Sequence, residues 1–440
     1  MSIVQRFFNV RPGEGLPITV AALYFFFVLT ALMVLRPARD AIGMSGGLDA
    51  VRWLFIGTAI VTLAVNPVFG WLVSRFRRLV FIALTYGFFA VSLVGFYLLI
   101  VLAPQAVGEV SGRVFYVWFS VFNLFSTMVF WALMADRFTL EQSKRIFGVL
   151  AVGGTLGAIF GPWLASVLAG RIGTPALMLV SAVFLGLSIG AAWLVARVQP
   201  EVEPGAGQRA DDRAIIGGTA WSGVGAVFRS PYLLGISGYV LVMTIVATFI
   251  YFTRLQMVAA AADDIDTRTT IFAQIDLITQ LATLVLQAVV TGHLMRRLGV
   301  SFALGLLPVV VAAGFVGLAA IGSFAMLIVF DAAFRAIQRA ITRPARETLF
   351  TVVTREEKYK SKAFTDTFVY RGGDVIGAWT EGLLGRLGMG LVGLSSLAVP
   401  LAVAWGGLGL WLGRRQQQRA AEAAAQPDAA PTVPSTPPVA

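Results

Sequence analysis

The sequence contains no cysteine and one histidine, and only 13% of its 440 residues are charged. Without cysteine there can be no disulfide, thiolate nucleophile or thiolate metal ligand. A single histidine cannot build a zinc site, and no group of acids has the spacing of a calcium loop. No nucleophile–base set is recognisable either. We therefore predict a protein that is not an enzyme and that needs no metal or cofactor.

The low charge content is matched by a hydrophobic fraction of 58%. A soluble domain has charge on about a quarter of its residues. Here apolar runs long enough to cross a bilayer recur along the whole sequence, which indicates helical membrane spans. An outer-membrane barrel would instead show short segments of alternating hydrophobicity. The sequence therefore predicts an all-α, polytopic membrane protein.

The formal net charge of +11 is concentrated in short loops. The basic residues of these loops are Arg75, Arg77, Arg78, Lys144, Arg145, Arg296, Arg297, Lys358, Lys360, Lys362, Arg414 and Arg415. They alternate with less basic loops, which is the positive-inside pattern of a membrane protein. We therefore predict a multi-pass protein of the bacterial inner membrane with both termini in the cytoplasm. The charge reports orientation in the lipid bilayer and does not indicate a nucleic-acid partner.

Twelve candidate spans fall into two groups of six. They cover residues 17–36, 51–74, 79–102, 113–135, 146–169 and 174–196, and then 231–253, 268–294, 300–322, 324–345, 363–385 and 390–412. These groups predict an N-terminal half (1–197) and a C-terminal half (231–413). A charged segment with several prolines predicts a cytoplasmic linker (198–230). The Gln-, Ala- and Pro-rich end predicts a disordered cytoplasmic tail (414–440).

Two short patterns recur at matching positions of the two halves. Gly-x-Leu-x-x-Arg occurs at Gly70 and again at Gly292, after the second span of each half. The pairs Gly153…Gly157 and Gly373…Gly377 lie in spans 5 and 11, where glycine permits close helix packing. Six spans, a linker and six spans resemble the major facilitator superfamily, whose signature loop is similar to the first pattern. The acid of that loop is replaced here by Ser74 and Arg296.

Charged residues inside the spans are the candidates for a functional site. Asp331, Arg335 and Arg339 follow one drifting stripe of a helix, and the next span carries further charges. Such groups are costly at membrane depth, so they normally face a partner or a wet cavity and mark a pathway. The predicted substrate-binding residues are Arg39, Asp40, Arg335, Arg339 and Arg371. The predicted proton-coupling or cavity residues are Asp276, Asp331, Asp374 and Glu381.

Purely structural roles remain open for the same residues. Arg335 has Asp331 one turn away as an internal partner, and Arg339 has the acids of span 11. Arg39 and Asp40 follow the end of the first predicted span, where an interfacial anchor and a substrate gate are both compatible with the pattern. Arg371 and Asp374 are one turn apart and form a possible structural ion pair.

Three stretches resemble the ATP/ADP antiporters of plastids and intracellular bacteria, a branch of this superfamily. Leu35-Arg-Pro-Ala-Arg39-Asp40 is similar to that family's Leu-Arg-x-x-Lys-Asp. The stretch from Trp131 to Phe147 is similar to its Trp…Asn…Glu-Ala-Lys-Arg-Phe-Tyr. Residues 344–366 contain Pro-Ala-Arg-Glu and then Glu-Glu-Lys-Tyr-Lys-Ser-Lys-Ala-Phe-Thr-Asp, similar to Pro-Thr-Lys-Glu…Glu-x-Lys-x-Lys-Gly-Lys-Ala-x-x-Asp. The resemblance implies exchange of ATP for ADP.

Two departures separate the sequence from that branch. The family has an acid and a Trp-Lys pair around span 7, whereas residues 246–254 contain no acid and offer Tyr251 and Arg254. Arg39 stands in the place of a lysine, and a guanidinium contacts phosphate oxygens differently from an ammonium. Membership in the family is therefore better supported than its nucleotide activity.

These observations predict a secondary active transporter that moves a small organic anion by alternating access and works as a monomer. The resemblance implies a nucleotide or another phosphorylated metabolite as its cargo. One alternative is a proton-coupled transporter of another solute, with Asp374 or Asp276 carrying the proton. A second alternative is a non-transporting, lipid-handling or receptor-like relative that has kept the fold.

Overall fold

The computed structural model of the protein describes residues 11, 13–200, 225, 227–289 and 291–425. Every regular element among these residues is helical, so the predicted fold class is confirmed. Most of the predicted linker, and residues 426–440 of the predicted tail, lie outside the described residues.

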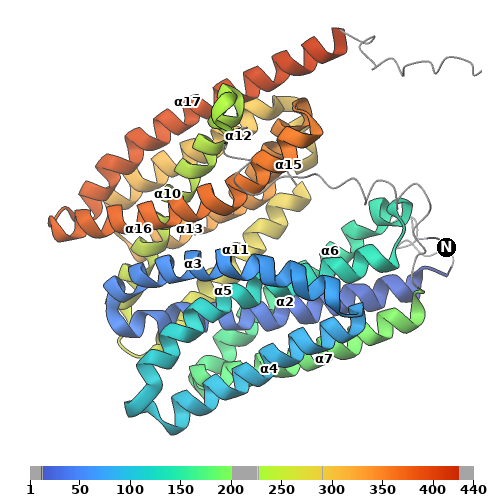
Figure 1. Ribbon diagram of the computed structural model, residues 1–440. Coiled ribbons are helices and arrows are strands. Elements are labelled where there is room, and N and C mark those ends of the chain that lie inside the picture. The colour runs from blue at the N-terminus through green and yellow to red at the C-terminus, as the bar shows by residue number, and fades with distance from the viewer. Residues whose placement is uncertain (1–10, 12, 201–224, 226, 290, 426–440) are drawn as a thin grey trace, which may run out of the picture.

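Helices α2 to α7 form the N-terminal half, and α10 to α17 form the C-terminal half (Figure 1). The first set is α2 (Gly15–Gly43), η1 (Met44–Gly46), α3 (Gly47–Arg75), α4 (Arg78–Leu102), α5 (Pro104–Arg137), α6 (Leu140–Ile172), η2 (Thr174–Ala176) and α7 (Leu177–Val198). The second set is α10 (Pro231–Ala261), α11 (Ile265–Val289), α12 (Thr291–Ile321), α13 (Phe324–Ile337), η3 (Gln338–Thr342), α14 (Arg343–Thr348), η4 (Leu349–Val352), α15 (Arg355–Phe364), η5 (Thr365–Val369), α16 (Tyr370–Arg386) and α17 (Gly390–Ala425).

Nine helical segments of the described chain are long and apolar enough to cross a membrane. The first of them runs from Gly15 to Val65 and contains both α2 and the start of α3. The predicted spans 324–345 and 363–385 are not among the nine. Each is interrupted by a π-helical turn, η3 or η5, and each carries several charges. These two segments therefore place charged side chains inside the bundle, and each also exposes large apolar side chains such as Val329 and Leu383.

Several helices are longer than the sequence predicted, and two of the differences affect predicted features of the site and of the tail. The first span was expected to end at residue 36, but α2 continues through Pro37 to Gly43. Proline removes only its own N–H, and the helix after it is held by packing against α6, α7 and α11. Arg39 and Asp40 consequently lie inside a buried helix and not at an interfacial helix end. At the other terminus, α17 extends to Ala425, because its Gln, Arg, Ala and Glu residues favour helix.

Each half has its own hydrophobic core. In the N-terminal half the rings of Phe25 and Phe130 stack at 4.0 Å between centroids. In the C-terminal half Tyr239 packs against Trp405 at 5.2 Å and donates its hydroxyl to the carbonyl of Leu304. A third, smaller cluster joins residues of both halves near one end of the molecule. Each half therefore packs around its own core, and helix α11 of the C-terminal half also packs extensively against α6 and α2 of the N-terminal half.

Equivalent glycine pairs hold one helix pair tightly in each half. A Cβ on Gly157 of α6 would come within 2.3 Å of the carbonyl oxygen of Phe26 of α2. A Cβ on Gly377 of α16 would come within 3.0 Å of the carbonyl oxygen of Ile245 of α10. Only glycine permits such backbone approach, so the repeated pattern is a packing device, as predicted, and not a phosphate loop.

The two ends of the helix bundle differ in charge and in closure. The end that carries Arg78, Arg145 and Lys360, on the right of Figure 1, is called the basic end here. Arg145 donates to Glu14 at 3.0 Å there and lowers the pKa of that carboxyl. At the opposite end the two halves are in contact, because α3 packs on α16. The backbone N–H of Thr174 also donates to the carboxylate of Asp266 there, at 2.7 Å. The molecule is thus closed at one end only.

Candidate functional site

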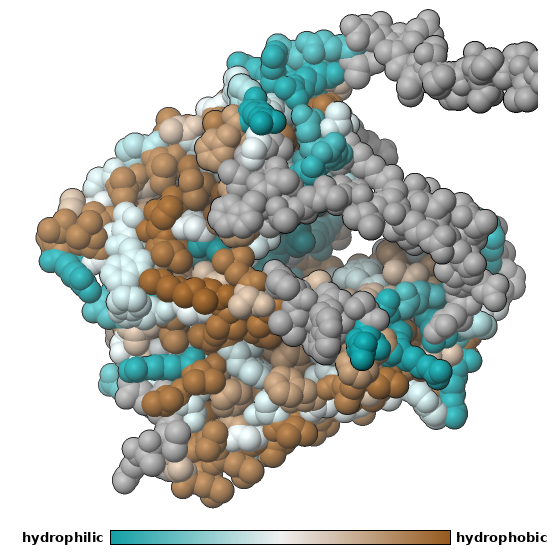
Figure 2. Space-filling view, in the orientation of Figure 1, coloured by the Kyte–Doolittle hydropathy of each residue, from teal (hydrophilic) through white to brown (hydrophobic). Residues whose placement is uncertain are grey.

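The central cavity lies between the two halves and has a volume of about 830 Å³. Pockets of roughly 300–1,000 Å³ are typical of small-molecule sites. Figure 2 shows hydrophobic side chains over much of both halves and a hollow between them with hydrophilic residues in its depth. Its lining is Met33, Arg36, Arg39, Phe55, Thr58, Tyr116, Ser120, Asn123, Met243, Ala247, Thr248, Tyr251, Arg254, Asp331, Phe334, Arg335, Gln338, Arg339, Thr342, Arg343, Arg346, Asp366, Tyr370, Arg371 and Asp374.

Arginine dominates the charge of this cavity. Its lining contains eight arginines and three aspartates. Two further aspartates, Asp40 and Asp276, contact the lining arginines from behind. Eight arginines against five aspartates leave an excess of three positive charges. An anion that enters the cavity therefore meets a favourable potential, which is stronger in a partly desolvated site than in bulk water.

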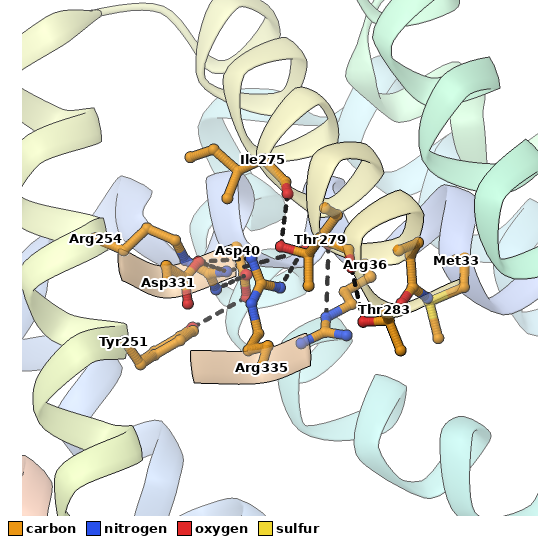
Figure 3. A network of polar contacts seen from close by, with 12 residues as sticks. Met33, Arg36, Asp40, Tyr251, Arg254, Ile275, Thr279, Thr283, Asp331 and Arg335 are labelled. Carbon is orange, nitrogen blue, oxygen red and sulfur yellow. Dashed lines mark hydrogen bonds and ion pairs between the residues drawn. The ribbon is translucent and has the colours of Figure 1, made fainter. Parts of the chain in front are cut away.

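Five buried residues form an ionic network at the inner end of the cavity (Figure 3). Arg254 of α10 donates to Asp40 of α2 at 3.0 Å and lies 3.4 Å from Asp331 of α13. The same guanidinium lies 3.8 Å from Asp276 of α11. Arg335 contacts Asp276 and donates to Asp331 at 2.5 Å. Each carboxylate thus has at least two basic neighbours.

Residues of α2 and α10 extend the ionic network on both sides. Arg36 lies 3.6 Å from Asp276, and Arg39 donates its Nε–H to Asp40 at 2.9 Å. The hydroxyl of Tyr251 donates at 3.0 Å to the same carboxylate oxygen as Arg39, and Arg254 donates to the other oxygen. Buried charge is tolerated only when it is paired and hydrogen-bonded in this way. Because α2 belongs to one half and α10 to the other, the pairs also connect the two halves.

The helix from Asp331 to Arg346 presents a series of arginines to the cavity. Arg335, Arg339 and Arg343 are spaced four residues apart, which in a regular α-helix gives a stripe that drifts around the axis. The π-helical turn η3 has more residues per turn and rotates the later ones back, so that all three line the cavity. Arg339 contacts the side-chain oxygen of Gln280 and, among the described residues, no carboxylate. It therefore has no carboxylate partner at ion-pair distance in the described part of the chain.

Helix α16 contributes a second charged pair to the wall. Arg371 lies 3.3 Å from Asp374, and both line the cavity. Asp374 therefore has one basic neighbour at ion-pair distance, whereas the acids of the ionic network have several. Glu381, predicted as a coupling or cavity residue, does not line the central cavity.

Glu381 belongs instead to the closure of the opposite end. Arg52 of α3 donates to it at 2.7 Å, and Gln256 of α10 donates at 2.5 Å. One residue further along α3, the ring of Trp53 packs edge-on against Trp379 at 5.1 Å. Arg52 and Glu381 are both buried, so this ion pair between the halves is shielded from water. It blocks access to the central cavity from that end.

The sequence match that decides the family covers most of the chain. The model of the Major Facilitator Superfamily matches residues 15–354. The chain belongs to this superfamily. It is therefore a major facilitator transporter, and the predicted superfamily is confirmed. The match does not single out the ATP/ADP branch, and none of the curated proteins matches the chain in sequence.

Solved structures of major facilitator proteins share the fold. A bacterial homologue of the iron transporter ferroportin in an inward-facing state is similar with a TM-score of 0.64 and 12% identity, over 94% of this chain and all of that one. A bacterial homologue of the human lysosomal transporter Spinster, inward-facing and unoccupied, has a TM-score of 0.59 and 14% identity, over 94% and 96%. The POT family transporter PepTSo has a TM-score of 0.61 and 12% identity, over 93% and 98%.

The structure brings together most of the residues that the sequence singled out. Arg39, Arg335, Arg339, Arg371, Asp331 and Asp374 line the cavity, and Asp40 and Asp276 lie in the ionic network behind it. Sequence reasoning assigned no site role to Arg254, although it contacts three of the five acids. The available signal was an arginine within a long apolar span, the same feature that marked Arg335.

Proposed function

We propose that this major facilitator transporter carries a small organic anion by secondary active transport. The observation that carries the proposal is the excess of three positive charges in a central cavity of about 830 Å³. Arginine side chains bind phosphate and carboxylate groups through two parallel hydrogen bonds. Arg339 and Arg343 have no carboxylate neighbour among the described contacts, so an anionic cargo supplies the missing counter-charge.

Alternating access gives this arrangement a mechanism. The cavity opens at the basic end, and the charge pattern of the loops supports the cytoplasmic side for this end. The pair of Arg52 and Glu381 holds the opposite end shut. Cargo entering from the basic end reaches Arg339 and then the ionic network, whose pairs connect the halves. Rocking of one half against the other then closes the basic end and separates Arg52 from Glu381.

A phosphorylated metabolite is the cargo class that the family resemblance favours, and a nucleotide is one member of it. The volume of the cavity and its several arginines support a cargo with more than one negative charge. The residues at the position of the antiporters' acid and Trp-Lys pair are Tyr251 and Arg254, which here hold Asp40. Nucleotides, sugar phosphates and dicarboxylates should therefore all be tested as candidate cargo.

A thermal-stability screen of the purified protein tests the cargo class. We expect multivalent organic anions, drawn from ADP, ATP, sugar phosphates and dicarboxylates, to raise the melting temperature, whereas uncharged sugars and amines should not. Binding to the folded state alone stabilises it by about 2.7 kcal/mol at one hundred times the Kd. Compounds that stabilise the protein are then assayed for counterflow in liposomes. A screen in which no anion stabilises the protein would reject the proposal.

The counterflow assay also separates the alternatives. Asp374 has one ion-pair partner and lines the cavity, which favours it over the acids of the ionic network as a proton carrier. Uptake driven by a proton gradient without cargo on the far side would identify a proton-coupled transporter. Obligatory exchange that ignores the gradient would identify an antiporter. Binding without any flux would identify a receptor-like relative that does not transport.

Single cysteines offer a test of alternating access, because the sequence has none of its own. Ala247 lines the central cavity, and Ala378 is fully buried in the closure of the opposite end. We expect a membrane-impermeant thiol reagent to label Ala247→Cys from the basic side in the empty protein and to leave Ala378→Cys unlabelled. Transported cargo should slow the first reaction and allow the second from the opposite side. Unchanged labelling of Ala378→Cys during transport would contradict the mechanism.

A further inference from the structure

The two walls of the central cavity differ in charge. The C-terminal half supplies six of the eight lining arginines and all three lining aspartates. The N-terminal half supplies Arg36 and Arg39, and acids hold both of them. Arg36 lies 3.6 Å from Asp276, and Arg39 donates to Asp40 at 2.9 Å. The guanidinium that is left for an anion, above all that of Arg339, therefore belongs to the C-terminal wall.

Helix α5 gives the N-terminal wall an uncharged polar face. Tyr116, Ser120 and Asn123 all line the cavity, and their spacing places them on one side of the helix. Ser120 is partly exposed and Asn123 is exposed, so a molecule in the cavity can reach both side chains. The side-chain amide of Asn123 and the hydroxyl of Ser120 have no hydrogen-bond partner among the described residues. Polar side chains within an apolar span are costly, and those that face a cavity mark a pathway.

Asn123 and Arg339 lie at a similar depth on the two walls. The hydroxyls of Tyr116 and Tyr251 are 3.0 Å apart, and Tyr251 donates to the ionic network. Asn123 follows Tyr116 by seven residues, which is roughly 10 Å of helix. Arg339 follows Asp331 of the same network by eight residues, a similar rise. Both helices continue from the network toward the basic end, so one ligand in the cavity can meet both side chains.

We propose that Asn123, with Ser120 beside it, is a specificity-determining residue that hydrogen-bonds the uncharged part of the cargo while Arg339 binds the anionic group. A carboxamide both donates and accepts, so it suits hydroxyl, carbonyl and amide groups, whereas a guanidinium only donates and suits an anion. The cargo is then an organic anion with hydrogen-bonding groups away from its phosphate or carboxylate. This inference rests on the proposed anion transport and narrows its substrate class.

Contact with both walls also connects binding to transport. A ligand shifts a conformational equilibrium only as far as it binds one state better than the other. An anion held by the C-terminal wall alone keeps the same contacts whether or not the halves approach each other. A cargo that also reaches Asn123 gains contacts as the basic end closes. We therefore expect a simple aliphatic anion to bind without being transported.

Matched ligands and a matched variant test the inference. The ligand pairs are ribose 5-phosphate with pentyl phosphate, D-glucarate with adipate, and ADP with pentyl diphosphate, and the pair that raises the melting temperature is the active pair. Asn123→Leu removes the amide and keeps the size of the side chain. Thr127→Val is the control, because Thr127 lies one turn further along α5, donates to a backbone carbonyl and does not line the cavity. The readouts are the melting temperature without ligand, the Kd of each compound and its counterflow rate.

We expect the wild type to bind the hydroxylated member of the active pair about tenfold more tightly, as one hydrogen bond implies, and to transport only that member. Asn123→Leu should abolish the preference and leave the Kd of the aliphatic member unchanged. The melting temperature of this variant without ligand should be at or above the wild-type value. Arg339→Ala should instead weaken both members by the same factor, and Thr127→Val should behave like the wild type.

The contrary results are distinguishable. If the wild type binds and transports both members of every active pair equally, the inference is wrong while anion binding stands. The same conclusion follows if Asn123→Leu keeps the preference or weakens both members equally. If Asn123→Leu lowers the melting temperature, Asn123→Ala and Ser120→Ala take its place, and an unchanged preference in both overturns the inference. If the wild type binds no anion at all, the proposed function itself fails.

Discussion

Replacing Arg254 with methionine should lower the free energy of unfolding by about 3–5 kcal/mol, the usual cost of removing one partner from a buried ion pair. Arg254 is 3% exposed and lies within 4 Å of Asp40, Asp276 and Asp331. Without it, the three buried carboxylates are left with fewer positive neighbours at the inner end of the cavity. Thermal and denaturant unfolding in detergent would measure the loss.

Two companion variants separate charge imbalance from lost packing. Arg254→Met combined with Asp40→Asn should recover part of the stability, because the carboxylate left unpaired is neutralised in the same protein. Arg171→Met, at an exposed position near the end of α6, should change stability little. If Arg254→Met unfolds at the wild-type temperature, the ionic network does not stabilise this state and our account of it is wrong.

Arg339→Ala should abolish most transport while leaving the protein folded. Arg339 contacts the amide of Gln280 and no described carboxylate, so its removal creates no unpaired acid. If its guanidinium binds the anionic group of the cargo, the loss of a charge-assisted hydrogen bond weakens binding by about 10- to 100-fold. Counterflow rates and the Kd of the best ligand measure the effect, and the melting temperature of the empty protein verifies folding.

A charge-preserving variant tests the geometry of the same contact. Arg339→Lys keeps the positive charge but loses the planar guanidinium that binds two oxygens at once. Its counterflow rate should therefore lie between those of the wild type and Arg339→Ala. Arg171→Ala serves as the control for loss of an arginine outside the cavity. Full transport by Arg339→Ala would remove Arg339 from the binding site.

The sequence was sufficient for the architecture because each membrane span is a local feature. A run of apolar residues predicts a span without reference to the rest of the chain, and the glycine repeat predicted close packing in both halves. The end of the first span was misjudged because a proline suggests a helix end, and only the tertiary packing of α2 shows that the helix continues to Gly43.

The site was less predictable because it depends on contacts between distant segments. Asp40 and Arg254 are separated by 214 residues, and no local pattern indicates that they meet. The sequence did not predict the π-helical turn η3 either, since an α-helical periodicity was assumed for the stripe that contains Arg339. Glu381 was predicted as a coupling or cavity residue together with Asp374, but it lies at the closure of the opposite end. Local periodicity predicts the face of a helix on which a residue lies, but it does not predict how close that residue is to either end of the bundle.

The charge of the central cavity also has an electrical consequence. When access switches from one side of the membrane to the other, the excess of three positive charges moves relative to the membrane field. One elementary charge crossing a potential of 100 mV involves about 2.3 kcal/mol. A bound trivalent anion cancels that work, whereas an empty carrier must perform it. Exchange of one such anion for another is therefore insensitive to voltage, and the return of the empty carrier is the step that the membrane potential controls.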